Sequence, residues 1–441
     1  MNTLEEIPLN ALEVPDYLPD DLIIVSELAE DIIGSEIIQI AAEVNKKIKL
    51  GEKIYNFTIG DFNPKIFSIP SRLKSSIIRM IENDETNYPP SNGEPELRNA
   101  VSNLLKARCE LDYDSDQILI ACGARPIIET IFQTVVNPGD KVVFPTPSWN
   151  NNHYTYLSRA NSMSIETTPN NKFMPTATEL QPHISTASLI ALCSPLNPTG
   201  TTFRKEDLEK ICDLILDENL KRAKSKQKPL YLMYDQIYWA LTFGDTKHYN
   251  PVTLRPKMRN YTIFVDGISK SLAATGLRVG WGFGPKKIIS KMSDFLTHKG
   301  AWSPKAEQLA TAEYLKDLEG YDLDLMAFKE KVNSRLVRLY DGFQTLKSEG
   351  FNVDVIAPEA AIYLTVQFAL HGKITEDGKK LETTKDITQY ILDEAKVAMV
   401  PFYAFGSSKD SNWYRLSVGK SKIEEIPDVF KNLRNALAQL R

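Results

Sequence analysis

Short apolar runs alternate with amphipathic stretches through the middle of the chain. Between several of these runs lie segments with helical periodicity, such as 126–136 and 206–219. Near-continuous apolar strands separated by helices predict an α/β domain in which a mainly parallel seven-stranded sheet lies between helices. The predicted strands are 118–121, 141–144, 163–167, 188–193, 230–234, 261–265 and 279–283.

The two ends of the chain follow different patterns. The first 25 residues contain three prolines among many acidic residues, which predicts an extended arm, and apolar positions at helical spacing predict a helix over 35–49. After Ser303, a long charged helical stretch (304–347), a strand (361–368), a polar stretch (372–385), another helix and a segment ending at 417 predict a smaller α+β domain. We therefore expect an arm and helix over 1–50, a large domain over 51–305 and a small C-terminal domain over 306–441.

Composition excludes several classes of protein. The 441 residues are 42% hydrophobic and 25% charged, which suits a globular protein with a large core. With 52 basic and 57 acidic residues the formal net charge is −5, so we expect no nucleic-acid partner. No apolar run approaches the roughly 18 residues of a membrane helix, and the acidic N-terminus is unlike a signal peptide. Four scattered cysteines without a CxxC pair favour a cytoplasmic protein, and we expect no metal site.

Polar and charged residues follow the carboxyl ends of the predicted strands, where open α/β sheets bind ligands. Singly, each has a commonplace structural explanation, such as a solvated lysine, a turn-forming acid or a core tryptophan. Together they match the needs of one cofactor, pyridoxal 5′-phosphate (PLP). In chain order these residues are Ala124, Arg125, Trp149, Asn197, Asp235, Tyr238, Ser269, Lys270 and Arg278.

Each part of PLP has a candidate partner in this set. Lys270 can form a Schiff base with the aldehyde, and Asp235 can keep the pyridine nitrogen protonated. Asn197 and Tyr238 can donate to the ring oxygen, and Trp149 can stack on the ring. The phosphate can bind where Gly123-Ala124-Arg125 opens a helix, with the guanidinium of Arg278 beside it.

With these motifs the sequence resembles the class I aminotransferases of fold type I, from about Ser26 to the C-terminus. Segments 269–281, 197–200 and 235–238 resemble the family's cofactor-lysine motif, its Asn-Pro-Thr-Gly turn and its Asp-x-x-Tyr element. The resemblance implies a large PLP-binding domain and transfer of an amino group between an α-amino acid and a 2-oxo acid. This ping-pong reaction would proceed through a Lys270 Schiff base, with Asp235 and Tyr238 as the other catalytic residues.

Further segments match the family's substrate and subunit contacts. Segment 414–417 resembles the strand whose arginine, here Arg415, grips the substrate α-carboxylate, with the loop at Gly60 and the amide of Asn197 nearby. Segment 88–98 resembles the one that sends a tyrosine, here Tyr88, to the phosphate of the neighbouring subunit. This implies a homodimer with shared active sites, to whose contacts residues 1–50 contribute.

Three positions depart from the family pattern. Gly267 stands where many members have a serine that donates to the phosphate. Asn152 stands where many have a histidine behind the cofactor acid, and His153 is one residue further on. Lys299 is the nearest equivalent of the partner-subunit arginine that binds a substrate side-chain carboxylate.

Alternatives to transamination stay open at this point. The same site could serve a PLP-dependent lyase, or bind PLP in a regulatory protein without turnover, although residues 1–50 offer no basic helix-turn-helix. The run GxGxG at 280–284 prompts a dinucleotide enzyme, but it falls inside a predicted strand. Selectivity for the amino donor would lie in the arm, in 299–303 and near Tyr363. Trp149, in its Pro-Ser-Trp context, favours aspartate-like or aromatic donors.

Overall fold

The computed structural model describes residues 23–32, 34 and 36–441, so most of the predicted arm lies outside the described residues. The chain divides into two units, 1–34 and 35–441. In the first, helix α1 (Glu27–Glu30) begins after Ser26, whose hydroxyl accepts a hydrogen bond from the Ala29 amide. Among the described helices, none has the length and apolar character needed to cross a membrane.

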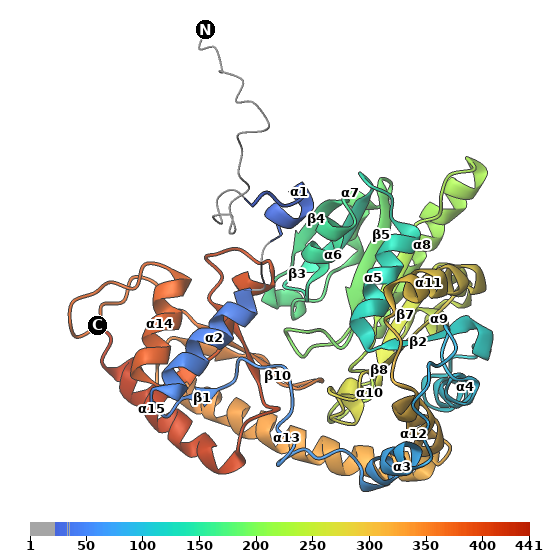
Figure 1. Ribbon diagram of the computed structural model, residues 1–441. Coiled ribbons are helices and arrows are strands. Elements are labelled where there is room, and N and C mark those ends of the chain that lie inside the picture. The colour runs from blue at the N-terminus through green and yellow to red at the C-terminus, as the bar shows by residue number, and fades with distance from the viewer. Residues whose placement is uncertain (1–22, 33, 35) are drawn as a thin grey trace, which may run out of the picture. The chain divides into compact units, whose positions relative to one another are not determined.

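The centre of the second unit is a seven-stranded sheet with the strand order β2-β8-β7-β6-β5-β3-β4 (Figure 1). Neighbouring strands from β7 through β4 run parallel, whereas β8 is antiparallel to both β2 and β7. The prediction of a mainly parallel sheet with seven strands is confirmed. The strands are β2 (Ile118–Cys122), β3 (Lys141–Thr146), β4 (Asn161–Glu166), β5 (Ala187–Cys193), β6 (Tyr231–Asp235), β7 (Thr262–Gly267) and β8 (Val279–Phe283).

Helices cover both faces of this sheet, because alternate strand residues point to opposite sides. On β3, Val142 and Phe144 join the cluster formed with α5 and α11, while Val143 joins the opposite cluster with α4, α8 and α12. All three strand residues are buried, which explains the near-continuous apolar runs in the sequence. The helices of this part are α3 (Ser71–Glu82), α4 (Pro95–Cys109), α5 (Ala124–Val135), α6 (Asn151–Leu157), α7 (Ala177–Ile184), α8 (Lys205–Lys224), α9 (Pro251–Leu254), α10 (Ile268–Ser271), α11 (Lys286–Lys299) and α12 (Lys305–Leu315).

A second, antiparallel sheet of four strands has the order β12-β13-β10-β9. Its core is formed with the long helix α13, whose first turns pack at Tyr321 against the large-sheet cluster and whose later turns pack from Val332 onward against the small sheet. The elements are α13 (Leu318–Ser348), β9 (Val353–Val355), β10 (Tyr363–Phe368), α14 (Thr384–Glu394), β11 (Val397–Ala398), β12 (Val400–Pro401), β13 (Trp413–Ser417) and α15 (Ile426–Ala438). The domain bounds at 50 and 305 stay a prediction.

The helix predicted near the N-terminus joins this C-terminal part of the chain. Helix α2 (Glu36–Lys49) packs Val44 against Leu392 of α14, and the strand β1 (Tyr55–Asn56) that follows pairs in parallel with β11. In Figure 1, α2 and β1 lie beside α14 and α15, although they are far apart in the sequence. One face of α2 is thereby held next to the loops at the carboxyl ends of the large sheet.

Candidate active site

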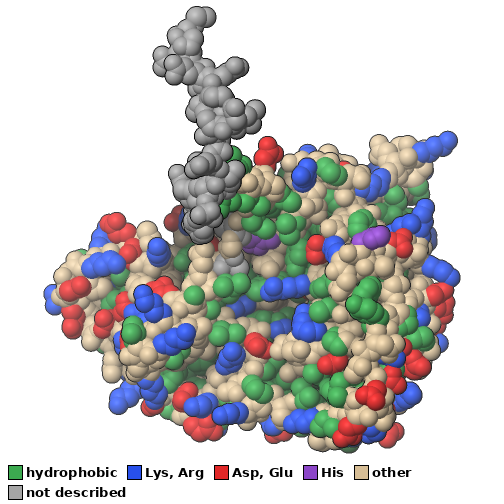
Figure 2. Space-filling view, in the orientation of Figure 1, with side chains coloured by type: hydrophobic (Ala, Val, Ile, Leu, Met, Phe, Trp, Pro, Cys, Tyr) green, Lys and Arg blue, Asp and Glu red, His purple; other side chains and the backbone are tan. Residues whose placement is uncertain are grey.

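A cavity of about 790 Å³ lies where the carboxyl ends of β5 and β6 and helix α10 face strands β10 and β13. Lys and Arg side chains gather near the middle of the face seen in Figure 2. Of the predicted site residues, Tyr88 is outside the cavity lining. The predicted residues that line it are Gly60, Ala124, Arg125, Trp149, Asn197, Asp235, Tyr238, Ser269, Lys270, Arg278 and Arg415.

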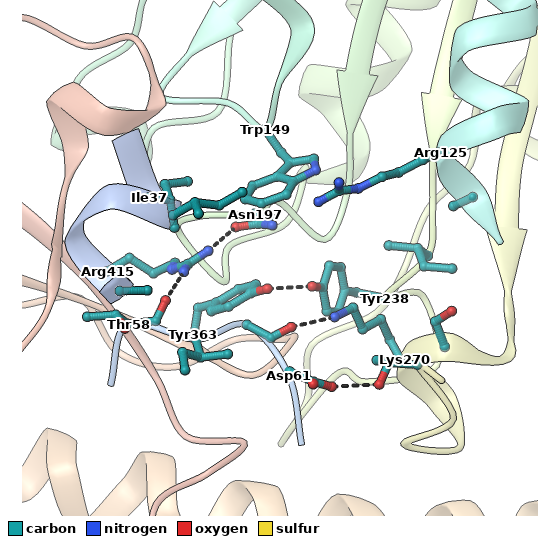
Figure 3. A pocket seen from close by; sticks show the side chains of 18 of the residues that line it. Ile37, Thr58, Asp61, Arg125, Trp149, Asn197, Tyr238, Lys270, Tyr363 and Arg415 are labelled. Atoms are coloured by element: carbon teal, nitrogen blue, oxygen red, sulfur yellow. Dashed lines mark hydrogen bonds between the residues drawn. The ribbon is translucent and has the colours of Figure 1, made fainter. Parts of the chain in front are cut away.

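Lys270 projects from α10 into this cavity, and its Nζ donates a hydrogen bond to the backbone carbonyl of Gly60 across 2.7 Å (Figure 3). Burial lowers the pKa of Lys270 to about 8, and Asp61 opposes that change while Arg415 and Arg125 add to it. With that pKa, roughly one tenth of the amine is neutral at pH 7, compared with less than about one in a thousand for an exposed lysine. A neutral amine is the form that attacks an aldehyde and accepts a proton.

Asp235 ends β6 and faces the same cavity. Burial raises the pKa of its carboxyl group to about 6, while the amide of Ile237, which donates to Oδ1 across 3.0 Å, and the charge of Lys270 oppose the rise. A carboxylate held in such a place is stabilised by a cation that reaches it from the cavity. The protonated nitrogen of a pyridine ring is a ligand group of this kind.

Arg415, on β13, is buried with 1% of its surface exposed. Its Nη1 donates to Asn197 Oδ1 across 3.0 Å and its Nη2 donates to the Thr58 carbonyl across 2.6 Å, while Nε has no partner. The guanidinium lies 4.8 Å from the ring centres of both Tyr363 and Phe405. No carboxylate in the described part of the chain pairs with it, so its charge suits a carboxylate ligand.

The opposite end of the cavity has the donors that a phosphate needs. Helix α5 begins after Gly123, whose φ of +85° is readily adopted by glycine. A Cβ at that position would overlap the guanidinium of Arg278, which donates to the carbonyls of Thr275 and Cys122 across 2.8 and 2.9 Å. The α5 N-terminus, Arg278 and the hydroxyl of Ser269 thus form an anion-binding donor set.

Arg125 and Trp149 form another wall. The Arg125 guanidinium lies 5.4 Å from the ring centre of Trp149, and both side chains face the cavity in Figure 3. Helix α2 also lines the cavity, with Ile37, Ala41 and Asn45. In the described residues Arg125 has no carboxylate partner, so a second cation besides Arg415 is available to a substrate.

The glycine at 267 has a packing explanation. A Cβ on Gly267 would lie 2.8 Å from both Gly280 Cα and Val279 O, so a serine there would force β7 and β8 apart. A Cβ on Gly280 would likewise lie 2.5 Å from the backbone carbon of Gly123. The GxGxG run on β8 therefore allows backbones to approach closely inside the sheet, and it does not open a helix as a dinucleotide-binding turn does.

Besides Tyr88, two residues singled out in the sequence, Lys299 and His153, lie away from the cavity lining. Tyr88 is 82% exposed and its ring meets Trp302 edge-on at 5.4 Å. Lys299 forms an ion pair with Glu129 across 2.5 Å. His153 is on α6 and has no place among the residues around the cavity. The roles suggested for these residues stay predictions.

Sequence reasoning missed several contacts within the site. Thr275 Oγ1 donates a hydrogen bond to Asp61 Oδ1 across 2.6 Å. This bond holds the carboxylate that opposes the lowering of the Lys270 pKa. The hydroxyls of Tyr238 and Tyr363 lie 2.6 Å apart. Such pairs connect segments far apart in the chain, and no local motif marks them. The sequence places donor selectivity near Tyr363 but does not predict its contact with Tyr238.

The comparisons with known proteins agree with this geometry. The family model for aminotransferase class I and II matches residues 46–432. A probable aspartate/prephenate aminotransferase of Rickettsia felis is 28% identical over 378 residues, which cover 85% of this chain and 87% of that protein. An aspartate aminotransferase of Rhizobium meliloti is 27% identical over 393 residues, which cover 88% of this chain and 90% of that protein.

Solved structures extend the comparison to the fold. The crystal structure of the aspartate aminotransferase from Rhizobium meliloti matches with a TM-score of 0.85 and 26% identity, covering 95% of this chain and 100% of that one. The aspartate aminotransferase of Thermus thermophilus with maleate matches with a TM-score of 0.83, covering 94% and 100%. At 22% identity the latter comparison concerns the fold alone.

Proposed function

Because the chain belongs to the aminotransferase class I and II family, we propose that the cavity around Lys270 binds PLP and takes an acidic amino acid such as aspartate as donor. The chain is a fold type I aminotransferase that acts on an α-amino acid and a 2-oxo acid. The lyase and regulatory alternatives have no support among its relatives.

One observation supports the proposal most strongly. Three guanidinium groups, those of Arg125, Arg278 and Arg415, surround Lys270 in one cavity, and in the described residues none of them pairs with a carboxylate. Arg415 is buried, Arg278 is partly buried and Arg125 is exposed. Three cations that line one cavity without carboxylate partners favour anionic ligands. A phosphate beside Arg278, an α-carboxylate beside Arg415 and a side-chain carboxylate beside Arg125 meet that requirement.

The residues present fit PLP. The α5 N-terminus, Ser269 and Arg278 would hold the phosphate, Asp235 would pair with the ring nitrogen, and Asn197 and Tyr238 would donate to the ring oxygen. Asn197 can do so because its Oδ1 accepts from Arg415, which leaves its NH₂ group available. Trp149 would cover one face of the ring. When bound, PLP supplies the electron sink for the bond that breaks at the substrate α-carbon.

The chain's own residues then move the proton and orient the substrate. Arg415 binds the α-carboxylate and thereby turns the Cα–H bond toward Lys270. The neutral Nζ of Lys270 would take the proton from the α-carbon as a general base and, as a general acid, deliver it to the cofactor carbon that carried the aldehyde. Arg415, with 1% of its surface exposed, is well shielded from water, which strengthens its attraction to a carboxylate.

We propose a homodimer in which Tyr88 reaches the phosphate of the other subunit. The support is its position: a large aromatic side chain is 82% exposed and lies away from its own chain's cavity. Sedimentation equilibrium on the active protein tests this, and a fully active monomer would refute it. A cytosolic location is also proposed, since all four cysteines, which lie in the described part, are free thiols.

A coupled assay tests the function. The wild-type protein supplied with PLP, aspartate and 2-oxoglutarate should produce glutamate and oxaloacetate in equal amounts. Lys270→Ala should abolish turnover, because no other amine replaces Nζ at the α-carbon. Normal turnover by that variant would refute the role of Lys270, and ammonia release without an oxo-acid acceptor would indicate a lyase instead.

A further inference from the structure

Two buried tyrosine hydroxyls form a hydrogen bond in the middle of the cavity. The Oη atoms of Tyr238 and Tyr363 are 2.6 Å apart, and the two rings meet at 68° with centres 5.5 Å apart. The exposed fractions of the two residues are 2% and 1%. Tyr238 follows β6 of the large sheet and Tyr363 begins β10 of the small sheet, so the bond joins the two sheets at the site (Figure 3).

The structure holds Tyr363 in place on several sides. The Arg415 guanidinium lies 4.8 Å from its ring centre, and β10 pairs with β13 so that Tyr363 is opposite Ser417. A Cβ added to Gly60 would lie 2.7 Å from the Tyr363 hydroxyl. The Tyr363 hydroxyl therefore adjoins the Gly60 backbone, whose carbonyl accepts a hydrogen bond from Lys270.

The protons of the pair can be assigned from their surroundings. Burial raises the pKa of Tyr363, and the Arg415 guanidinium opposes that rise; burial raises the pKa of Tyr238 well above its usual value. Both phenols are thus neutral at neutral pH, and they share one hydrogen bond between them. Because the cation lies over the ring of Tyr363, Tyr363 is the better donor, which leaves the Tyr238 proton free for a ligand in the cavity.

We propose that Tyr363 is a positioning residue: its hydroxyl donates to Tyr238 and so directs and strengthens the hydrogen bond that Tyr238 donates to the ring oxygen of PLP. A hydroxyl that accepts one hydrogen bond becomes a better donor in the next. The inference rests on the proposed function, in which Tyr238 contacts that oxygen. Through Tyr363, the small sheet would thereby affect the hydrogen bond at the ring oxygen of PLP.

The test is a pH titration of the visible spectrum of the holoenzyme, which follows protonation of the nitrogen joining Lys270 to PLP. Tyr363→Phe keeps the ring beneath Arg415 and removes only the hydroxyl. Tyr238 then donates less strongly, the ring oxygen becomes more basic, and the nitrogen keeps its proton to higher pH. We expect the apparent pKa to rise by roughly half a unit or more, a threefold or larger change in the equilibrium.

A double-mutant cycle separates this role from a general structural one. Tyr238→Phe should raise the same pKa further, and adding Tyr363→Phe to it should change nothing more, because Tyr363 acts through Tyr238. Tyr414→Phe is the matched control, since this buried tyrosine on β13 donates instead to the Thr384 carbonyl; it should leave the titration unchanged. No shift in Tyr363→Phe, or additive shifts in the double variant, would overturn the proposal.

A second variant keeps the test decisive if Tyr363→Phe fails to fold. Replacing Tyr363 by 3-fluorotyrosine makes the phenol more acidic and a stronger donor, so the apparent pKa should fall instead of rise. An unchanged or raised value would contradict the proposal. A wild-type protein that binds no PLP and shows no visible band would refute the proposed function itself, which is a different outcome from an unshifted titration in a yellow variant.

Discussion

Arg415 Nη1 donates a hydrogen bond to Asn197 Oδ1 across 3.0 Å, although the two residues are 218 positions apart in the sequence. The contact joins β13 of the small sheet to the loop after β5 of the large sheet. It fixes the amide of Asn197 with its NH₂ group free, and it fixes the guanidinium that is to bind the substrate. Arg415, which is to bind the α-carboxylate, and Asn197, which is to contact the cofactor, thus orient each other.

Replacing Arg415 by Lys should therefore weaken substrate binding and turnover more than it weakens the binding of PLP. A lysine keeps the charge but cannot donate to Asn197, to Thr58 and to a carboxylate in one plane. We expect kcat/KM to fall by roughly 10- to 100-fold, the equivalent of about 1.5–3 kcal/mol for hydrogen bonds to a charged group. Steady-state kinetics and the visible spectrum check this together; a variant with normal kcat/KM, or one that has lost PLP, would contradict it.

Arg125 should decide between acidic and neutral donors. Removing its charge in Arg125→Leu should lower kcat/KM for aspartate about 10- to 100-fold more than for alanine, since alanine has no distal carboxylate to pair. Arg125→Lys is the control that keeps the charge and should retain much of the preference. The ratio of the two kcat/KM values is the readout, because loss of the contact with Trp149 affects both donors. Equal losses would show that Arg125 has no part in selectivity.

The uptake of PLP by the apoprotein should depend on pH through Lys270. Only the neutral amine forms the bond with the aldehyde, and burial lowers the pKa of Lys270 to about 8. The rate of appearance of the visible band should rise with pH and level off above about pH 8. If Lys270 were exposed, the rate of band appearance would continue to rise with pH toward the ordinary lysine pKa of 10.5. A rate still rising steeply at pH 9.5 would show an unshifted amine, and Lys270→Ala should develop no band at all.

Asp266 should make stability depend on pH. It is fully buried on β7, accepts from the Gly267 amide across 2.7 Å and contacts Gln236, and burial raises its pKa to about 8. Between about pH 4 and 8 the folded state keeps a proton that the unfolded state has lost. The free energy of unfolding must then fall as pH rises, by at most about 1.4 kcal/mol per unit from this one group.

Asp266→Asn keeps an oxygen for the Gly267 amide and removes the titration. Urea unfolding at pH 5, 6.5 and 8 should show the variant gaining stability relative to wild type as pH rises. The difference between the two proteins isolates Asp266, because other titrating groups are common to both. Parallel pH profiles would mean that this carboxyl group titrates alike in the folded and unfolded states.

Much of the fold could be predicted from the sequence, because both faces of the large sheet are covered. Each strand therefore reads as a short apolar run, and the seven predicted runs all coincide with strands. The boundary between α12 and α13 was not resolved, since the charged stretch 304–347 continues without a proline or glycine at the turn between Leu315 and Leu318. The antiparallel direction of β8 also leaves no mark in its composition.

The site was predictable where its residues follow strands, and less so where they depend on tertiary contacts. Asp235 ends β6 and Lys270 lies on the short helix that follows β7, so topology alone brings them to one edge. Tyr363 and Thr275 reach the site through hydrogen bonds to Tyr238 and Asp61, partners more than a hundred residues away. Gly267 is required by the close approach of the neighbouring strand β8, a tertiary contact that leaves no local pattern in the sequence.

The most direct test of the central claim is the absorption spectrum of the purified wild-type protein loaded with PLP, before and after adding aspartate without any oxo acid. The account predicts a yellow protein whose visible band is replaced by the near-ultraviolet band of the amine form of the cofactor, with one oxaloacetate released per subunit. A colourless protein that takes up no PLP, or a yellow one whose band no amino acid converts, would contradict it.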